Sequence, residues 1–166
     1  PAMQSAFHNL PTINSVMQQA GRRYAARDVQ YNLKEADTRL RMDIAPAYPD
    51  RAGVRTWVRT VSLNRGTDIQ VVDTFALKQA SWDITQSLIT PCEVVRNEPG
   101  RLVLRDSAEG VELAVGYDRD MLTAQIESIP PADDKLAEIW GPRLHRILLT
   151  PKSATRSATW TLRFSK

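Results

Sequence analysis

The sequence predicts an all-β protein, an antiparallel β-sandwich of about ten or more strands built from a single chain of 166 residues. Short runs in which apolar and polar residues alternate recur along most of the chain and are rich in Val, Ile, Thr and aromatic residues. Such runs are typical of half-buried strands. Turn-forming Pro, Gly, Asn and Asp residues separate the runs at short intervals, which favours antiparallel neighbours.

The expected strands follow one another with short connections. Residues 97–101 (NEPGR) and 107–110 (SAEG) have the composition of hairpin turns on either side of one strand. Short helices are expected at 16–20 and 133–139, and neither would change the fold class. The segments expected as strands are 57–63, 68–75, 93–95, 101–105, 111–117, 122–128, 143–149 and 159–164.

The domain organisation is expected to be simple. Residues 1–18 differ in character from the rest and are interpreted as a connecting segment, and residues 19–166 as the β-sandwich domain. No apolar run approaches the about 20 residues of a membrane-spanning helix. The first residues lack the basic and apolar segments of a signal peptide, so none is expected in this chain.

Positive charge is concentrated in the first part of the chain. Up to Gly66 there are ten Lys or Arg residues against five Asp or Glu, and Arg outnumbers Lys seventeen to five in the whole sequence. Guanidinium groups suit carboxylates, sulfates and phosphates, so an anionic partner is one interpretation and an ordinary solvated surface is the other. Aromatic residues are only partly interleaved with the basic ones between Arg22 and Arg65, as nucleic-acid binding would require, so no nucleic-acid partner is expected.

The sequence lacks the common catalytic and metal-binding motifs. Cys92, His8 and His145 are far apart and show no zinc-ligand spacing, so no metal and no cofactor is expected. Nothing marks a serine or cysteine nucleophile. Asp73, within an apolar strand, is expected either to pair with Arg59 or Arg55 or to face solvent.

His8 and the adjacent Asn9 lie in a stretch that is too broken for a helix and too polar for a core strand. A loop imidazole can donate, accept or transfer a proton around neutral pH, although loop histidines are also common without any function. Asn9 adds an amide donor suited to a carboxylate oxygen. His145 is interpreted as a strand residue, and Trp57 and Trp140 as packing residues rather than sugar-stacking ones.

The order of several segments resembles a known family. HNLPTIN at 8–14 precedes MQQAGRRYAA at 17–26, and AYPD at 47–50 precedes WVRTVSL and IQVVDTFAL. Trp140 and LHRILL at 144–149 follow near the end. From Phe7 onward this order is similar to the C-terminal β-sandwich region of heparinase II/III-like polysaccharide lyases.

The resemblance implies a supersandwich-like domain that normally faces an N-terminal helical domain across a substrate cleft. Such lyases cleave uronic-acid-containing polysaccharides by β-elimination and are periplasmic or secreted bacterial proteins. By the resemblance His8 matches the catalytic histidine that reaches into the cleft, and Asn9 matches a position that orients it or contacts substrate. The implied partners are an anionic polysaccharide and the helical domain, which supplies the remaining catalytic groups.

Two departures from the family pattern stand out. Ser15 replaces the usual glycine after Asn14, which is unfavourable if that turn needs a positive φ. Many relatives bind a metal through histidines and an aspartate, but Leu10 and the Trp57–Arg59 stretch supply no histidine here. The alternative function is a non-catalytic carbohydrate-binding or scaffold β-sandwich domain.

Overall fold

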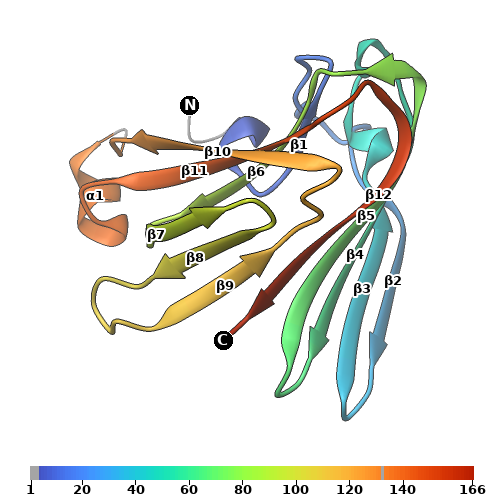
Figure 1. Cartoon of the computed structure of the whole chain (residues 1–166). Coiled ribbons are helices and arrows are strands. Elements are labelled where there is room, and N and C mark those ends of the chain that lie inside the picture. The colour runs from blue at the N-terminus through green and yellow to red at the C-terminus, as the bar shows by residue number, and fades with distance from the viewer. Residues whose placement is uncertain (1–3, 132) are drawn as a thin grey trace.

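Two antiparallel sheets form the protein in the computed structural model, which describes residues 4–131 and 133–166 (Figure 1). Strands account for 57% of the described residues and helices, including short 3₁₀ turns, for 10%. One sheet has eight strands and the other has four, and their facing sides enclose the core. The all-β antiparallel sandwich predicted from the alternating sequence pattern is therefore confirmed.

The eight-stranded sheet contains most of the alternating segments, and its neighbouring strands are antiparallel throughout. The last strand of the chain lies between β5 and β9 and joins the two halves of this sheet. Across the sheet the strands are β2 (Arg27–Leu33), β3 (Asp37–Asp43), β4 (Val54–Asn64), β5 (Asp68–Ser81), β12 (Thr155–Ser165), β9 (Glu112–Gly116), β8 (Arg101–Arg105) and β7 (Glu93–Glu98).

The four-stranded sheet is built from segments that are distant in the sequence. Its order is β1 (Pro11–Ile13), β6 (Ile84–Thr90), β11 (Leu144–Pro151) and β10 (Leu122–Ile129). β1 belongs to the segment 1–18 and pairs with β6 from Pro11 opposite Gln86 to Ile13 opposite Ile84. The chain just before β1 is thereby held at one edge of this sheet.

Aromatic rings fill the centre of the core. The rings of Trp57 and Phe75 stack with centroids 4.4 Å apart, and Trp160 meets Phe75 edge-on at 4.8 Å. These residues come from β4, β5 and β12 and are at most 3% exposed. Large buried aromatic side chains contribute more to core stability than any other residue type, so this cluster anchors the eight-stranded sheet to the rest of the fold.

The hairpins predicted at 97–101 and 107–110 are confirmed as the β7–β8 and β8–β9 connections. The helix expected at 133–139 is confirmed as α1 (Asp134–Trp140), whose first turn is capped by the Asp133 side chain accepting from the Leu136 N–H at 2.9 Å. Three short 3₁₀ turns complete the fold, η1 (Ser5–Phe7), η2 (Ala45–Ala47) and η3 (Asp50–Ala52). No helix in the described ranges has the length and apolar character to cross a membrane.

The helix expected at 16–20 is wrong. Asn14 and Ser15 both adopt left-handed φ angles, which turn the chain back so that Val16 bridges to Ile13. The next backbone N–H groups are used outside any helix, because Gln18 donates to the Ser5 hydroxyl and Gln19 to the Ala47 carbonyl. The segment therefore runs as an extended connection across the end of the sandwich.

Candidate functional site

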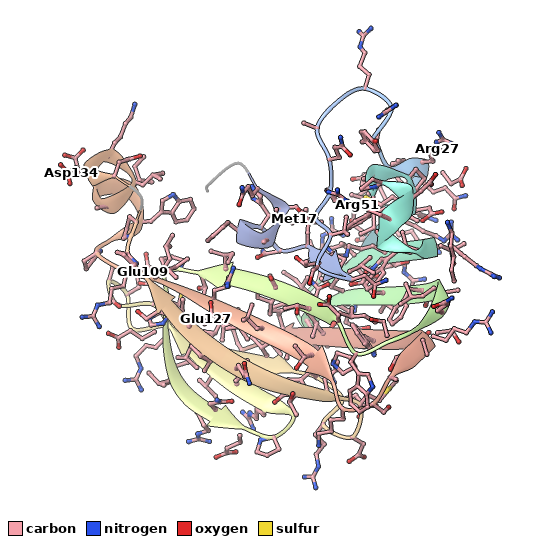
Figure 2. The ribbon with its side chains drawn as sticks, turned by 90° about the horizontal axis from the view of Figure 1, so that it is seen from above. Met17, Arg27, Arg51, Glu109, Glu127 and Asp134 are labelled. Atoms are coloured by element: carbon pink, nitrogen blue, oxygen red, sulfur yellow. The ribbon has the colours of Figure 1, made fainter. Side chains whose placement is uncertain are left out.

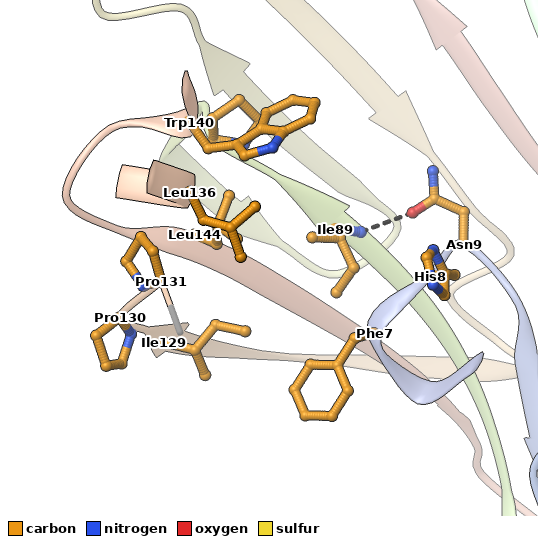
Figure 3. Close-up of a pocket in the computed structure, with 11 residues that line it drawn as sticks. Phe7, His8, Asn9, Ile89, Ile129, Pro130, Pro131, Leu136, Trp140 and Leu144 are labelled. Atoms are coloured by element: carbon orange, nitrogen blue, oxygen red, sulfur yellow. Dashed lines mark hydrogen bonds between the residues drawn. The ribbon is translucent and has the colours of Figure 1, made fainter. Parts of the chain in front are cut away.

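An apolar pocket of about 670 Å³ lies beside the segment that carries His8. Figure 3 shows His8 and Asn9 on the side of the pocket across from Leu136 and Trp140. Its walls come from η1, the end of β6, the β10–α1 connection, α1 and the start of β11. The lining residues are Phe7, His8, Asn9, Ile89, Pro91, Ile129, Pro130, Pro131, Leu136, Trp140 and Leu144.

His8 has a fixed backbone and a free side chain. Its N–H donates to the Ser5 carbonyl at 3.1 Å and its carbonyl accepts from the Leu10 N–H at 2.8 Å, so η1 ends at a defined point. Phe7, just before it, lies under the Arg146 guanidinium, 5.2 Å from the ring centroid. The His8 imidazole is exposed and has no hydrogen-bond partner among the described residues. It is therefore available to a ligand at the rim of the pocket.

Asn9 is held at both its side chain and its backbone. Its Oδ1 accepts from the Ile89 N–H at 2.8 Å, the bond drawn in Figure 3, and its carbonyl accepts from Arg59 at 2.6 Å. The side-chain oxygen is thus occupied by β6, and only the Nδ2 group remains to donate to a substrate. The clearest role of Asn9 in the structure is to hold the neighbouring His8 against the four-stranded sheet.

A buried ion pair holds the backbone of Asn9 in place. Arg59 on β4 binds Asp73 on β5 through two hydrogen bonds, Nε to Oδ1 at 2.8 Å and Nη2 to Oδ2 at 2.6 Å. The same guanidinium donates to Gln86 Oε1 on β6 at 2.9 Å and to the Asn9 carbonyl. All three side chains of the network are buried. Because β4 and β6 belong to different sheets, this network links the two layers directly beneath the His8 segment.

Sequence analysis expected Asp73 to pair with Arg59 or Arg55, and the pairing with Arg59 is confirmed. The hydrogen bonds from Arg59 to Gln86 and to the Asn9 carbonyl were not predicted. The sequence carried no clear signal for Gln86, since four of the seven residues of its strand (ITQSLIT, 84–90) are polar. Strands β4 and β6 are not sequence neighbours, so local patterns do not show that they meet.

Tyr48 ties the other side of the same segment to the fold. Its buried hydroxyl donates to the Pro11 carbonyl at 2.5 Å. Burial raises the pKa of the Tyr48 phenol well above its usual range, and the nearby Arg59 opposes this only in part. The phenol therefore stays protonated and acts as a structural donor rather than as an acid or base.

Of the remaining candidate residues, Trp140 lies at the same pocket as His8, whereas His145 and Trp57 do not. His145 lies half-buried on β11, is not among the residues lining the pocket, and its Nδ1 atom has no hydrogen-bond partner in the described chain. Trp57 is confirmed as a core residue, whereas Trp140 is 48% exposed and lines the pocket. Within residues 4–131 and 133–166 no three His, Cys, Asp or Glu side chains come together as metal ligands would.

Sequence comparison finds no matching family model, and no curated protein matches the chain. Comparison of structures does find relatives. Heparan sulfate lyase HepC from Pedobacter heparinus superposes with a TM-score of 0.69 at 12% identity, over 98% of this chain and 24% of HepC. A heparinase III gene product superposes with a TM-score of 0.70 at 10% identity, over 98% of this chain and 24% of the heparinase III chain.

The chain thus spans about a quarter of the length of the solved proteins it matches. At such low identity the agreement concerns the fold. Nearly the whole chain takes part in the superposition. The chain therefore has the fold of one domain of heparinase III-like proteins.

Proposed function

We propose that this chain is the β-sandwich domain of a heparinase II/III-like lyase that cleaves a uronic-acid-containing polysaccharide by β-elimination. In this proposal His8 contributes to a cleft shared with an N-terminal helical domain, and the protein acts in the periplasm or outside the cell. Support comes from the fold likeness to heparan sulfate lyase HepC and a heparinase III gene product. The likeness also leaves room for a further domain, since three-quarters of each relative lies outside the superposition.

The single observation that carries the catalytic part is the placement of His8. Its backbone is fixed by η1 and by the Asn9 contacts, while its imidazole is exposed and free at the rim of a pocket. A catalytic group needs a fixed position and an accessible reactive atom, and His8 has both. Asn9 serves this proposal as the residue that orients His8, with its free Nδ2 group available as a substrate donor.

β-Elimination removes the proton at C5 of the uronate, forms the C4–C5 double bond and breaks the bond between C4 and the leaving oxygen. Negative charge builds up on the carboxylate side as the proton leaves, and a donor aimed at that charge lowers the barrier. The imidazole of His8 would either donate to the carboxylate or accept the C5 proton, and in the first case a base of the helical domain would take that proton. The leaving oxygen takes up a proton, for which the helical domain would supply the group.

The test uses the longer protein that contains both domains. His8→Ala should lower turnover by about 10²- to 10⁴-fold, measured as the ultraviolet absorbance of the unsaturated uronate product, because a positioned proton donor or acceptor is lost. His145→Gln is the matched control, since it removes the other histidine without touching the pocket. Unchanged turnover in His8→Ala, with unchanged thermal unfolding, would remove His8 from the mechanism.

One observation favours the alternative, a scaffold domain that only packs against its neighbour. The pocket beside His8 is lined mostly by apolar side chains, which suit contact with another protein surface better than contact with an anionic sugar. If this alternative holds, Trp140→Ser in the longer protein should weaken the contact between the domains, which limited proteolysis would detect as faster cleavage. His8→Ala should then leave turnover unchanged. The lyase proposal predicts the opposite result for His8→Ala.

A further inference from the structure

A second pocket, of about 480 Å³, lies where the chain between 21 and 27 meets the segment 45–55. Figure 2 places Arg27 and Arg51, which mark this region, at the end of the molecule away from Asp134 of α1. It is thus separate from the apolar pocket that α1 helps to line. The lining residues are Arg23, Tyr24, Arg27, Ala45, Pro46, Tyr48, Pro49, Asp50, Val54 and Arg55.

The charge of this pocket is unbalanced. Arg23, Arg27 and Arg55 line it together with a single carboxylate, that of Asp50. None of the three arginines forms an ion pair with any described residue, whereas elsewhere Arg105 and Arg146 are each bound by a glutamate. Arginines without an ion pair are common in the described chain, Arg101 among them, so the distinguishing feature is that three arginines line one pocket with a single carboxylate. This excess of positive charge favours an anionic ligand.

Several contacts order the walls of the pocket. The Arg23 guanidinium lies over the Tyr24 ring, 4.7 Å from its centroid, and donates to the Tyr24 hydroxyl at 2.8 Å. Asp43 accepts from the backbone N–H groups of Ala45 and Trp57, which fixes the start of η2. A pocket whose residues are already ordered loses less entropy when a ligand binds.

The pocket is also tied to the segment that carries His8. Tyr48, which lines it, donates its hydroxyl to the Pro11 carbonyl, three residues beyond His8. Gln19 donates its N–H to the Ala47 carbonyl of η2. The connection 14–20 therefore runs between the two pockets, and an extended polymer bound at one could reach the other.

We propose that the pocket of Arg23, Arg27 and Arg55 binds a carboxylate or sulfate group of an anionic polysaccharide, at a place distinct from His8. The choice of a polysaccharide rests on the proposed function, whereas the choice of an anionic group rests on the pocket itself. A nucleic acid fits less well, because the Tyr24 ring is covered by Arg23 and Tyr48 is buried. The pocket therefore offers a base at most the second face of one ring, that of Tyr24, on which to stack.

The experiment measures binding of the 166-residue chain by calorimetry over a range of salt concentrations. The probes are a heparan sulfate oligosaccharide, the unsulfated oligosaccharide of the same backbone and a single-stranded DNA of matched charge. The variant Arg23→Gln/Arg27→Gln/Arg55→Gln removes the proposed contacts. Its control, Arg96→Gln/Arg101→Gln/Arg119→Gln, removes the same charge from exposed arginines on β7, on β8 and before β10.

The pocket variant should bind the sulfated oligosaccharide about tenfold or more weakly than the native chain, and its affinity should depend less steeply on salt. The control should lose less than about threefold, because it changes only the long-range attraction. Equal binding of the unsulfated oligosaccharide would identify carboxylates as the ligand, and its loss would identify sulfates. Equal weakening by both variants, no binding at all, or preferential DNA binding would overturn the proposal.

The outcome is separable from that of the lyase proposal. The arginine variant is judged by oligosaccharide affinity in the isolated chain and His8→Ala by turnover in the longer protein, and His8 does not line this pocket. If the arginine variant loses binding while His8→Ala keeps full turnover in the longer protein, the lyase mechanism fails and the binding site stands. If the arginine variant binds normally and His8→Ala is inactive in the longer protein, the arginine binding site fails and the lyase mechanism stands.

Discussion

Asn14 and Ser15 form the turn that directs the chain away from β1. Both have left-handed φ angles, 52° and 58°, and asparagine tolerates this conformation better than serine. The Asn14 side chain donates to the Ala52 carbonyl at 2.8 Å and accepts from the Ser81 hydroxyl, while the Ser15 hydroxyl donates to Asp83. These contacts hold an unfavourable backbone in place. From the sequence, Ser15 was expected to be unfavourable in a turn that needs a positive φ, and the structure gives it a left-handed φ.

Substitution at Ser15 separates backbone strain from side-chain bonding. Ser15→Ala loses the hydroxyl bond to Asp83 and keeps the strain, whereas Ser15→Gly loses the bond and removes the strain. We expect Ser15→Gly to be more stable than Ser15→Ala by about 1 kcal/mol, since a left-handed conformation costs non-glycine residues about that much. Urea unfolding of both variants measures the difference. Equal stability would show that the turn relaxes without strain.

The contact between β4 and β5 shows what strand patterns reveal about a site. A buried aspartate in an apolar strand requires a partner, so the sequence predicted that Asp73 either pairs with Arg59 or Arg55 or faces solvent. The structure shows the pair with Arg59. The third and fourth members of the network, Gln86 and the Asn9 carbonyl, were not predicted. They come from the opposite sheet, and alternation within a strand carries no information about which residues lie across the sandwich.

Breaking this network should cost much of the stability of the domain. Asp73→Ala leaves the Arg59 charge buried without its carboxylate, which costs about 3–5 kcal/mol in comparable buried pairs. The double variant Arg59→Met/Asp73→Leu removes both charges and should be more stable than Asp73→Ala by about 1 kcal/mol or more. Chemical unfolding measures both.

The same variants test the position of His8. Because Arg59 also binds the Asn9 carbonyl, the double variant should shift the imidazole NMR signals of His8 while leaving those of His145 in place. A double variant less stable than Asp73→Ala, or an unmoved His8 signal, would show that the network does not support the site in this way.

For the molecule as a whole, the sequence predicted the fold class and local hairpins better than the arrangement of sheets. The turns at 97–101 and 107–110 join neighbouring strands, so their composition was sufficient. The pairing of β1 with β6 and the insertion of β12 between β5 and β9 join distant segments, which no local pattern encodes. The apolar pocket escaped prediction for the same reason, since its walls come from both ends of the chain.

The two ends of the sandwich differ in chemistry, and this difference bears on how the domain meets a neighbour. The α1 end carries the apolar pocket with Trp140 at 48% exposure, whereas the opposite end carries the unpaired arginines. If the proposed helical domain packs on the apolar end, Trp140 should be covered in the longer protein. Trp82, 64% exposed and outside both pockets, supplies an internal control.

Hydroxyl-radical footprinting read by mass spectrometry tests this arrangement. In the isolated chain Trp140 and Trp82 should both be oxidised readily, because both rings are accessible. In the longer protein the oxidation of Trp140 should fall several-fold while that of Trp82 is unchanged, since a domain interface excludes water from its centre. Equal oxidation of Trp140 in the two proteins would show that the apolar pocket stays open. The helical domain would then have to approach His8 from the arginine side, and the cleft would be lined by charge rather than by Trp140 and Leu136.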